Sequence, residues 1–205
     1  MPKGSPERTA ARKEEIINAC EKLYQTMSFK DITLKEIGNE TSFSRPTIYN
    51  YYRTKEEIFL ALFEREYVHW NEELQSILRD NETLTKEQTA KKLASSLANR
   101  EQLLKLLAMN NYDMEANSRP ELLRSFKVAY GGSIENVSGI LKKFCPGKSD
   151  EEIRDFIYVF FPFMFGIYPY TAVTDKQRKA MKDAEVDFVY RSVFELVNNC
   201  LLKLL

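Results

Sequence analysis

Glycine and proline are scarce in this sequence, with only 7 of each among 205 residues. Both residue types interrupt regular elements, so a chain poor in them is expected to form few and long ones. Alternation of apolar and polar residues with a period of two is also missing over any long stretch, whereas nearly every segment repeats with the period of a helix. The sequence therefore predicts an all-α fold.

Cysteine and histidine are too few and too scattered for a metal site. Cys20, Cys145 and Cys200 are widely spaced and form no CxxC motif, which indicates reduced thiols in a reducing compartment. His69 is the single histidine, so no Cys/His cluster for zinc can form. We expect no metal and no cofactor.

Long apolar runs are absent as well. The longest, at 156–168, contains Pro162 and is shorter than the ~20 residues that a membrane span needs. The N-terminus is polar and lacks the apolar segment of a signal peptide. These features predict a cytoplasmic protein that does not bind membranes.

The motifs of common enzyme classes are missing too. The sequence contains no GxGxxG, no GxxxxGK[ST] and no GxSxG. Adjacent carboxylates, such as Glu14 with Glu15 and Glu151 with Glu152, stand at helix starts that are typical of solvent-exposed surface. We therefore expect no catalytic residues and no enzymatic activity.

Charge is distributed unevenly along the chain, although its formal net value is zero. Residues 1–55 carry ten basic and seven acidic side chains, which leaves +3 there and −3 in the remainder. A modest asymmetry of this kind is weak evidence for a polyanionic partner by itself.

Helical periodicity and capping signals divide the chain into segments. Capping boxes at Thr33–Glu36, Thr54–Glu57 and Ser149–Glu152 mark three helix starts. We expect the adjacent Gly131 and Gly132 to bend or break the helix that contains them. The predicted helices are 7–27, two short helices within 33–52, and 54–79, 86–98, 100–113, 119–144, 150–168 and 176–203.

The two short helices have the spacing of a helix-turn-helix over residues 33–52, with a reading helix at about 44–51. Ile48 is its core anchor and Tyr52 is expected to pack inward. Arg45 is suited to guanine, Asn50 to adenine and Thr47 to the thymine methyl group, while helix starts and tyrosine hydroxyls suit phosphates. The candidate DNA contacts are Thr33, Ser44, Arg45, Pro46, Thr47, Tyr49, Asn50, Tyr51, Thr54 and Lys55. The same spacing also fits a small three-helix unit with a polar surface and no DNA ligand.

These residues carry a family resemblance that covers roughly residues 10–65. Phe29-x-x-Ile32-Thr33-x-x-x-Ile37, followed by Ser44-Arg-Pro-Thr-Ile-Tyr49-Asn-Tyr-Tyr52-x-x-Lys55-Glu-Glu-Ile58, resembles the N-terminal domain of TetR-family transcriptional regulators. The resemblance implies an all-helical homodimer with a small-molecule pocket in its C-terminal domain, acting as a repressor that the ligand releases. Ser42 stands where the family usually has glycine in the turn, and a left-handed conformation there would cost serine about 1 kcal/mol.

The C-terminal half contains two helices with more apolar surface than one small domain readily covers. Residues 156–168 are apolar on all sides, and the last predicted helix has a wide apolar face. Pairing both with their copies would form a four-helix interface and would present two reading helices to a palindromic operator. The candidate interface residues are Phe156, Phe163, Val189, Val193, Leu196, Val197 and Leu201. The alternative is that both helices belong to the core of a monomer.

Aromatic residues and methionines in this half are candidates for a ligand pocket. They are Met109, Tyr112, Phe126, Tyr130, Phe160, Met164 and Tyr168. Aromatic residues at helical spacing also occur in ordinary cores, and that interpretation stays open for each of them.

The sequence thus predicts a DNA-binding domain at 1–53 and a ligand-binding and dimerisation domain at 54–205. Its expected partners are double-stranded DNA with a palindromic operator, a second copy of the chain and an unidentified small-molecule effector. Two alternatives remain: a DNA-binding regulator without a small-molecule ligand, and a helical protein-interaction module.

Overall fold

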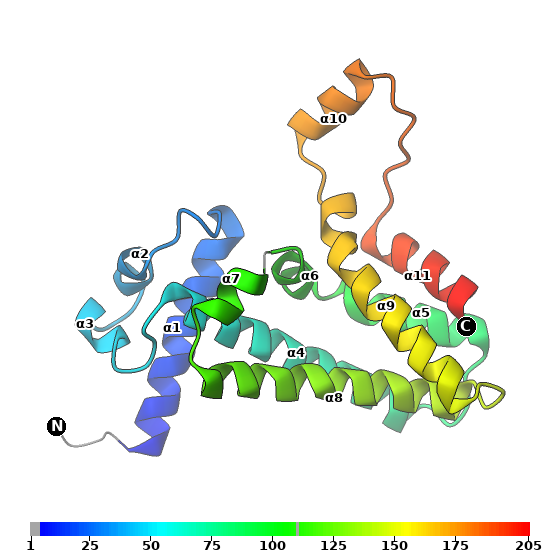
Figure 1. The fold of residues 1–205 in the computed structure, drawn as a ribbon, viewed down its shortest axis with the longest axis horizontal. Helices are drawn as coiled ribbons and strands as arrows, with labels where there is room; N and C mark the ends of the chain where they lie inside the picture. The colour runs from blue at the N-terminus through cyan, green and yellow to red at the C-terminus, as the bar shows by residue number, and fades with distance from the viewer. Residues whose placement is uncertain (1–4, 110) are drawn as a thin grey trace. The chain divides into compact units, whose positions relative to one another are not determined.

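The computed structural model describes residues 5–109 and 111–205, and every regular element in those ranges is a helix (Figure 1). The all-α prediction is confirmed. The helices are α1 (Pro6–Thr26), α2 (Leu34–Asn39), α3 (Arg45–Ile48), α4 (Lys55–Asp80), α5 (Lys86–Ala98), α6 (Glu101–Leu107), α7 (Asn111–Ala116), α8 (Pro120–Phe144), α9 (Asp150–Thr171), α10 (Asp175–Asp183) and α11 (Val193–Leu204).

The chain forms two compact units. The first unit contains Met1–Arg65 together with Asn110–Val128, and the second contains Glu66–Met109 together with Ala129–Leu205. Helices α4 and α8 each contribute residues to both units. In the described ranges no single helix is long and apolar enough to span a bilayer; α9 and α10 pass that test only as a pair bent by 85°.

The core of the first unit follows the predicted helical stripes. Helix α1 buries Ile16, Ile17, Cys20 and Tyr24, which recur on one face of the helix. Helix α2 packs on both α1 and α3. Ile37 from α2 and Ile48 from α3 are fully buried, and α4 adds a further apolar row at Ile58, Phe59, Leu62 and Phe63.

The second unit is built on different pairs of helices. Helix α11 packs against α5 and also contacts α9, which in turn packs on α6. Figure 1 shows α11 lying alongside α5. The buried residues of α9 are Ile153, Phe156, Ile157, Phe160, Phe161, Met164 and Ile167.

Capping boxes begin four helices of the second unit. The predicted pair Ser149 and Glu152 forms one at the start of α9. Thr85 with Gln88, Thr174 with Gln177 and Ser192 with Glu195 form the same reciprocal arrangement at the starts of α5, α10 and α11. These three boxes were not predicted, although each has a hydroxyl residue with Gln or Glu three positions later.

The predicted helix 100–113 is wrong. Two shorter helices occupy this region: α6 ends at Leu107, and α7 begins at Asn111. The amide of Ala108 donates to the Leu104 carbonyl at the end of α6. Helix α6 belongs to the second unit and α7 to the first, so the two parts of the predicted helix pack in different cores.

The predicted helix 176–203 is also wrong, because residues 184–192 are not helical. Helix α10 ends where Glu185 adopts a left-handed conformation with φ of 54°. The amides of Val186 and Glu185 then donate to the carbonyls of Met181 and Lys182, which is a Schellman ending. This position is usually occupied by glycine. Because glutamate occupies it here, the sequence gives no signal for the end of the helix. We call residues 172–192, which contain α10, the arm.

The predictions of a bend or break at Gly131 and Gly132 and of a left-handed Ser42 are also wrong. Helix α8 is continuous through Gly131 and Gly132, where a Cβ on Gly132 would lie 3.1 Å from the Asn71 side-chain amide nitrogen. Gly132 therefore provides space for Asn71 and does not break the helix. Among the described non-glycine residues only Glu185 has a positive φ, so Ser42 carries no left-handed strain.

Candidate nucleic-acid interface

Helix α3 is fixed from its buried side. Ile48 is fully buried and Tyr52, which directly follows the turn after α3, is 2% exposed, which confirms that Tyr52 packs inward. On the side facing α2, a Cβ at Gly38 would lie only 3.3 Å from the Arg45 Cβ. Glycine at 38 thus permits the close approach that sets the position of α3.

The regular part of α3 is shorter than the predicted reading helix. It spans Arg45–Ile48, after which the amides of Asn50 and Tyr51 donate to the carbonyls of Thr47 and Ile48 three residues earlier. The segment 44–51 is therefore one helical turn followed by tighter turns.

The polar side chains of 44–51 are available on its outer side. Ser44, Arg45, Pro46, Tyr49 and Asn50 are exposed, whereas Thr47 and Tyr51 are half-buried. The Arg45 guanidinium donates to the Tyr49 hydroxyl over 3.0 Å and lies 5.8 Å from the centre of its ring. The Arg12 guanidinium reaches the Tyr51 hydroxyl at 3.4 Å. Donors, acceptors and rings are thus gathered on one small surface.

The predicted phosphate contacts at helix starts have partners within the chain. The Thr33 hydroxyl accepts from the amides of Lys35 and Glu36 and contacts the Glu36 carboxylate. The Thr54 hydroxyl accepts from the Glu57 amide at 3.2 Å and donates to the Asn117 carbonyl at 3.0 Å. Both side chains therefore already stabilise the helices that follow them.

Lys55 is also engaged inside the first unit. Its ammonium group donates to the carbonyls of Phe29 and Ile32 over 2.7 and 3.1 Å, and it lies 4.2 Å from the centre of the Phe29 ring. These bonds tie the first turn of α4 to the loop between α1 and α2. Lys55 therefore helps to fix the start of α4 relative to this loop.

Arg119 is a residue of this region that sequence reasoning missed. It lies just before α8, and its guanidinium donates to both carboxylate oxygens of Glu57, over 2.7 and 2.9 Å. The same guanidinium donates to the Tyr51 carbonyl at 2.7 Å. Glu57 is 1% exposed. No motif links residues 57 and 119, which lie more than sixty positions apart, so only the fold brings them together.

The Glu57 carboxylate is held in its charged form. Burial works against that charge, but hydrogen bonds from Arg119 and from the Arg53 and Arg119 amides outweigh the cost, so the pKa of Glu57 lies below its ordinary value. Glu57 and Arg119 therefore form a charged pair with matched geometry on both sides.

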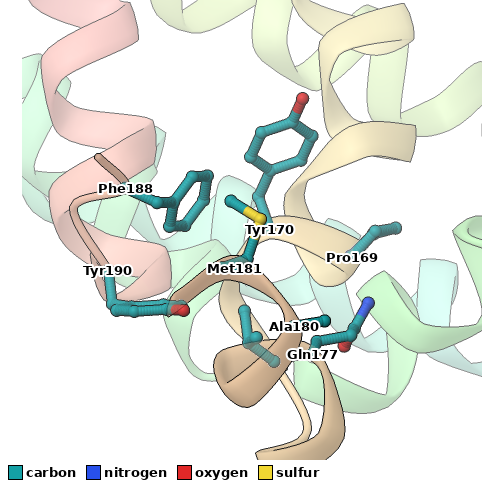
Figure 2. Close-up of a pocket in the computed structure, with 8 residues that line it drawn as sticks. Pro169, Tyr170, Gln177, Ala180, Met181, Phe188 and Tyr190 are labelled. Carbon is teal, nitrogen blue, oxygen red and sulfur yellow. The ribbon is translucent and has the colours of Figure 1, made fainter. Parts of the chain in front are cut away.

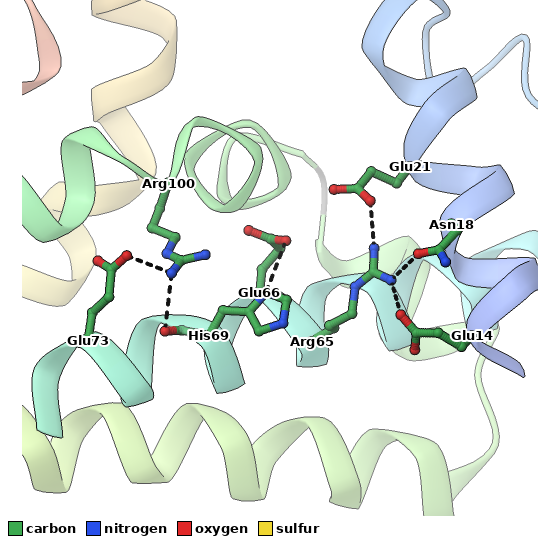
Figure 3. A network of polar contacts seen from close by, with 8 residues as sticks. All are labelled: Glu14, Asn18, Glu21, Arg65, Glu66, His69, Glu73 and Arg100. Atoms are coloured by element: carbon green, nitrogen blue, oxygen red, sulfur yellow. Dashed lines mark hydrogen bonds and ion pairs between the residues drawn. The ribbon is translucent and has the colours of Figure 1, made fainter. Parts of the chain in front are cut away.

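A second arginine joins α1 to α4 in the same unit. Arg65 donates to Glu14 at 2.5 Å, to Asn18 at 2.6 Å and to Glu21 at 2.8 Å, and all three partners lie on α1 (Figure 3). The Arg65 side chain is 14% exposed. This network fixes the angle between two helices and contacts no residue of 44–51.

The second unit contains a cluster of aromatic side chains that pack on one another. The Tyr67 ring contacts those of Trp70 and Tyr130 at centroid distances of 6.3 and 5.6 Å, and Phe161 lies 6.0 and 5.7 Å from Trp70 and Tyr130. The Trp70 indole donates to the Ser96 hydroxyl at 3.0 Å. Burial raises the pKa of Tyr67 and of Tyr130, so both hydroxyls stay protonated.

One ion pair accompanies this packing. The Arg100 guanidinium donates to the Glu73 carboxylate at 2.6 Å and to the His69 carbonyl at 3.4 Å (Figure 3). It thereby joins the residue that precedes α6 to α4.

The candidate pocket residues fall into both units. Tyr112 and Phe126 belong to the first unit, where Tyr112 is 85% exposed and Phe126 packs on Phe63 at 4.9 Å. The other five belong to the second unit. There Phe160 and Met164 are fully buried, whereas Met109, Tyr130 and Tyr168 are half-buried.

A hollow lies where the arm meets the end of α9, and Figure 2 shows the side chains around it. Its volume is about 380 Å³. Phe188 joins the two sides, with its ring 6.1 Å from that of Tyr170 and 5.0 Å from that of Tyr190. None of the seven candidate pocket residues lines it. The lining residues are Pro169, Tyr170, Val173, Gln177, Ala180, Met181, Phe188 and Tyr190.

The candidate interface residues differ in their exposure. Phe156, Val197 and Leu201 are buried within the chain, Phe163, Val193 and Leu196 are half-buried, and Val189 on the arm is 66% exposed. The outer face of α9 is charged at its start, where every residue from Asp150 to Asp155 except Ile153 is exposed, and it is apolar from Tyr158 onward. The residues exposed in that second part are Tyr158, Val159, Pro162, Phe165, Gly166, Pro169 and Tyr170.

Comparisons with known proteins agree with this architecture. Residues 16–62 match the model of bacterial regulatory proteins of the tetR family, and residues 64–195 match that of the tetracyclin repressor-like C-terminal domain. No curated protein matches the sequence.

Solved structures of transcriptional regulators share the fold. The transcriptional regulator FadR from Bacillus subtilis, in complex with stearoyl-CoA, is 18% identical with a TM-score of 0.60, over 93% of this chain and 96% of that one. FadR from Bacillus halodurans is 17% identical with a TM-score of 0.62, covering 98% and 96%. The repressor FadR from Thermus thermophilus, in complex with lauroyl-CoA, is 20% identical with a TM-score of 0.55, covering 93% of each chain.

Proposed function

Because the chain belongs to the TetR family of transcriptional regulators, we propose that it is a homodimeric repressor that reads a palindromic operator and is released by a small-molecule effector. The observation that carries the DNA-reading part is the segment 44–51. Ile48 anchors it in the core, while Arg45, Tyr49 and Asn50 remain exposed.

The side chains of this segment divide into base-reading and backbone-binding groups. Arg45 is suited to the two acceptors of guanine, Asn50 to adenine and the Thr47 methyl group to thymine. Ser44, Tyr49 and Tyr51 supply hydroxyls for phosphate oxygens. Lys55 receives a positioning role in this proposal, because its ammonium group already binds two backbone carbonyls.

The dimer is proposed to form through the outer face of α9 and the arm. Tyr158, Val159 and Phe165 are 78%, 50% and 41% exposed, and they line one side of α9 with Pro162 and Gly166. A continuous apolar stripe is uncommon on a monomer surface. In a two-fold dimer the stripe would be covered by the same stripe of the second copy.

Sedimentation velocity tests this interface with matched valine variants. Val159→Asp on α9 and Val189→Asp on the arm should shift the protein from twice 24.0 kDa toward the 24.0 kDa monomer. Val128→Asp is the control, because Val128 is 69% exposed on α8 but belongs to the first unit. A wild-type protein that sediments as a monomer at micromolar concentration would rule out the dimer.

The effector is proposed to be an acyl thioester, whose apolar acyl chain would enter the second unit. The support is the aromatic interior of the second unit, together with the fold shared with regulators whose structures contain stearoyl-CoA and lauroyl-CoA. The buried Tyr67 and the half-buried Tyr130 would provide the few polar groups of such a site.

Fluorescence anisotropy on the DNA upstream of the protein's own gene tests both parts of the function. Wild-type protein should bind this DNA more tightly than a random duplex, and the binding should weaken as salt rises. Stearoyl-CoA and lauroyl-CoA should release the DNA and raise the melting temperature, whereas coenzyme A without an acyl chain should do neither. Equal affinity for both duplexes would refute the reading role. Operator binding that no acyl-CoA changes would instead favour a regulator without this effector.

A further inference from the structure

The segment that precedes α8 is bonded to the end of the reading segment. Arg119 donates to the Tyr51 carbonyl at 2.7 Å, and Tyr51 closes the turns that follow α3. Next to this bond, the Thr54 hydroxyl donates to the Asn117 carbonyl at 3.0 Å. Two hydrogen bonds therefore connect the 117–119 stretch to residues 51–54, the link between the reading segment and α4.

Glu57 completes the connection. Its Oε1 accepts from the Arg119 side chain at 2.7 Å and from the Arg119 amide at 3.2 Å. Its Oε2 accepts from the Arg119 Nη2 at 2.9 Å and from the Arg53 amide at 2.7 Å. The carboxylate thus binds a backbone amide in the link, at Arg53, and one in the 117–119 stretch, at Arg119, and both partners belong to the first unit.

We propose that Arg119 is a positioning residue for operator recognition, which sets the orientation in which residues 44–51 meet the DNA. The proposal rests on the reading role given above to that segment. Arg119 acts through the Tyr51 carbonyl and Glu57, and it contacts no base itself. Base readout requires side chains placed to within a fraction of an ångström, so a small rotation of the segment is enough to lose it.

The geometry explains why the residue must be an arginine. A guanidinium is a flat fork that can bond both oxygens of a carboxylate and still direct a proton to a carbonyl. The Nη2 of Arg119 bonds the Glu57 Oε2 and the Tyr51 carbonyl, while Nε bonds the Glu57 Oε1. A lysine ammonium group is a single point of charge and cannot keep all three bonds in this arrangement.

Arg65 supplies a matched control within the same unit. It is also a partly buried arginine with carboxylate partners, Glu14 and Glu21, but its partners lie on α1 and not on the reading segment. Arg65→Met and Arg119→Met each remove one guanidinium from a network with acidic partners. Only the second of these networks includes a residue of 44–51.

The test compares binding to the operator with binding to a random duplex of the same length. We expect Arg119→Met to weaken operator binding about tenfold while leaving random-duplex binding within twofold of wild type. The ratio of the two affinities should then fall about tenfold. Arg119→Lys should recover only part of this ratio, and Arg65→Met should leave it unchanged, even where its melting temperature falls as far as that of Arg119→Met. Measurements are made at a temperature at which circular dichroism shows every variant to be folded.

A double variant separates positioning from stability. Arg119→Met alone leaves the Glu57 carboxylate buried without its partner, whereas the combined Arg119→Met and Glu57→Gln protein has no buried carboxylate at position 57. We expect the double variant to regain melting temperature but not the affinity ratio. The proposal is overturned if Arg119→Met keeps the wild-type ratio, or if the ratio returns together with the melting temperature. A wild-type ratio of one would mean instead that the proposed function has failed.

Discussion

Both units of this protein bury an apolar core, but the first adds two arginines with several partners each, whereas the second adds a cluster of packed rings. In the first unit, Arg65 and Arg119 each bond several partners on other elements, and each bond has a defined direction. In the second unit, the rings of Tyr67, Trp70, Tyr130 and Phe161 pack on one another. Hydrogen bonds of charged groups fix angles, whereas apolar contacts stabilise in proportion to the area they bury. The first arrangement suits a surface that must be oriented, and the second suits a core that needs stability.

The largest loss of stability is expected for a substitution among the packed rings of the second unit. Trp70→Ala removes a fully buried side chain and its bond to Ser96, so it should lower the free energy of unfolding by about 3–5 kcal/mol. Under conditions in which the variant is folded, its affinity for the operator should match that of wild type. Chemical denaturation followed by circular dichroism measures the first effect and anisotropy the second. A variant that is folded yet has lost operator binding would contradict the assignment of DNA reading to the first unit alone.

Lowering the pH should destabilise the first unit, because it protonates the Glu57 carboxylate. Its pKa is lowered in the folded protein, so its contribution to stability is fully present above its unfolded pKa and is lost as the pH falls through the folded value. Glu57→Gln should cost about 1.5–3 kcal/mol at neutral pH, since bonds to a charged group are lost. Below about pH 4.5, the ordinary pKa of a glutamate, the difference in free energy of unfolding between the variant and wild type should narrow. Denaturation midpoints measured from pH 7 to pH 3 test this, and a gap that stays constant would show that the Glu57 charge contributes nothing.

Arg45→Ala, in the reading segment, should weaken operator binding without changing stability, which is the reverse of what is expected for Trp70→Ala. Arg45→Ala should leave the melting temperature unchanged, because Arg45 is exposed and bonds only the Tyr49 hydroxyl among the described residues. It should weaken operator binding by about 1–3 kcal/mol and affect a random duplex less. Equal losses on both duplexes would assign Arg45 to the DNA backbone and not to a base.

Much of the fold follows from local patterns, and the site does so only in part. The stripe of α1, the burial of Ile48 and Tyr52 and the box at Ser149 were all predicted, since each depends on neighbours within a few positions. The break at Glu185 was missed because its left-handed conformation occurs at a residue type that gives no signal.

The pairing of Arg119 with Glu57 was missed for a different reason. It joins residues more than sixty positions apart, and no periodicity encodes such a pair. The internal role of Lys55 was missed likewise, because its carbonyl partners belong to the backbone at Phe29 and Ile32 and leave no trace in the side-chain sequence. Patterns of neighbouring side chains therefore predict which residues are buried, but not which backbone atoms the charged ones bind.

The smallest effect is expected at a helix start of the second unit. Ser192→Ala removes the hydroxyl that accepts from the Glu195 amide at 3.2 Å, and such a change typically costs about 1 kcal/mol. Glu195→Ala removes the other half of the box, the bond from the Ser192 amide at 2.8 Å. The two losses should not add fully, because each residue positions the other. Denaturation of the two single variants and the double variant measures this coupling. Since α11 packs on α5 within the second unit, none of the three should change operator affinity while folded, and a change would mean that the end of the arm bears on DNA reading.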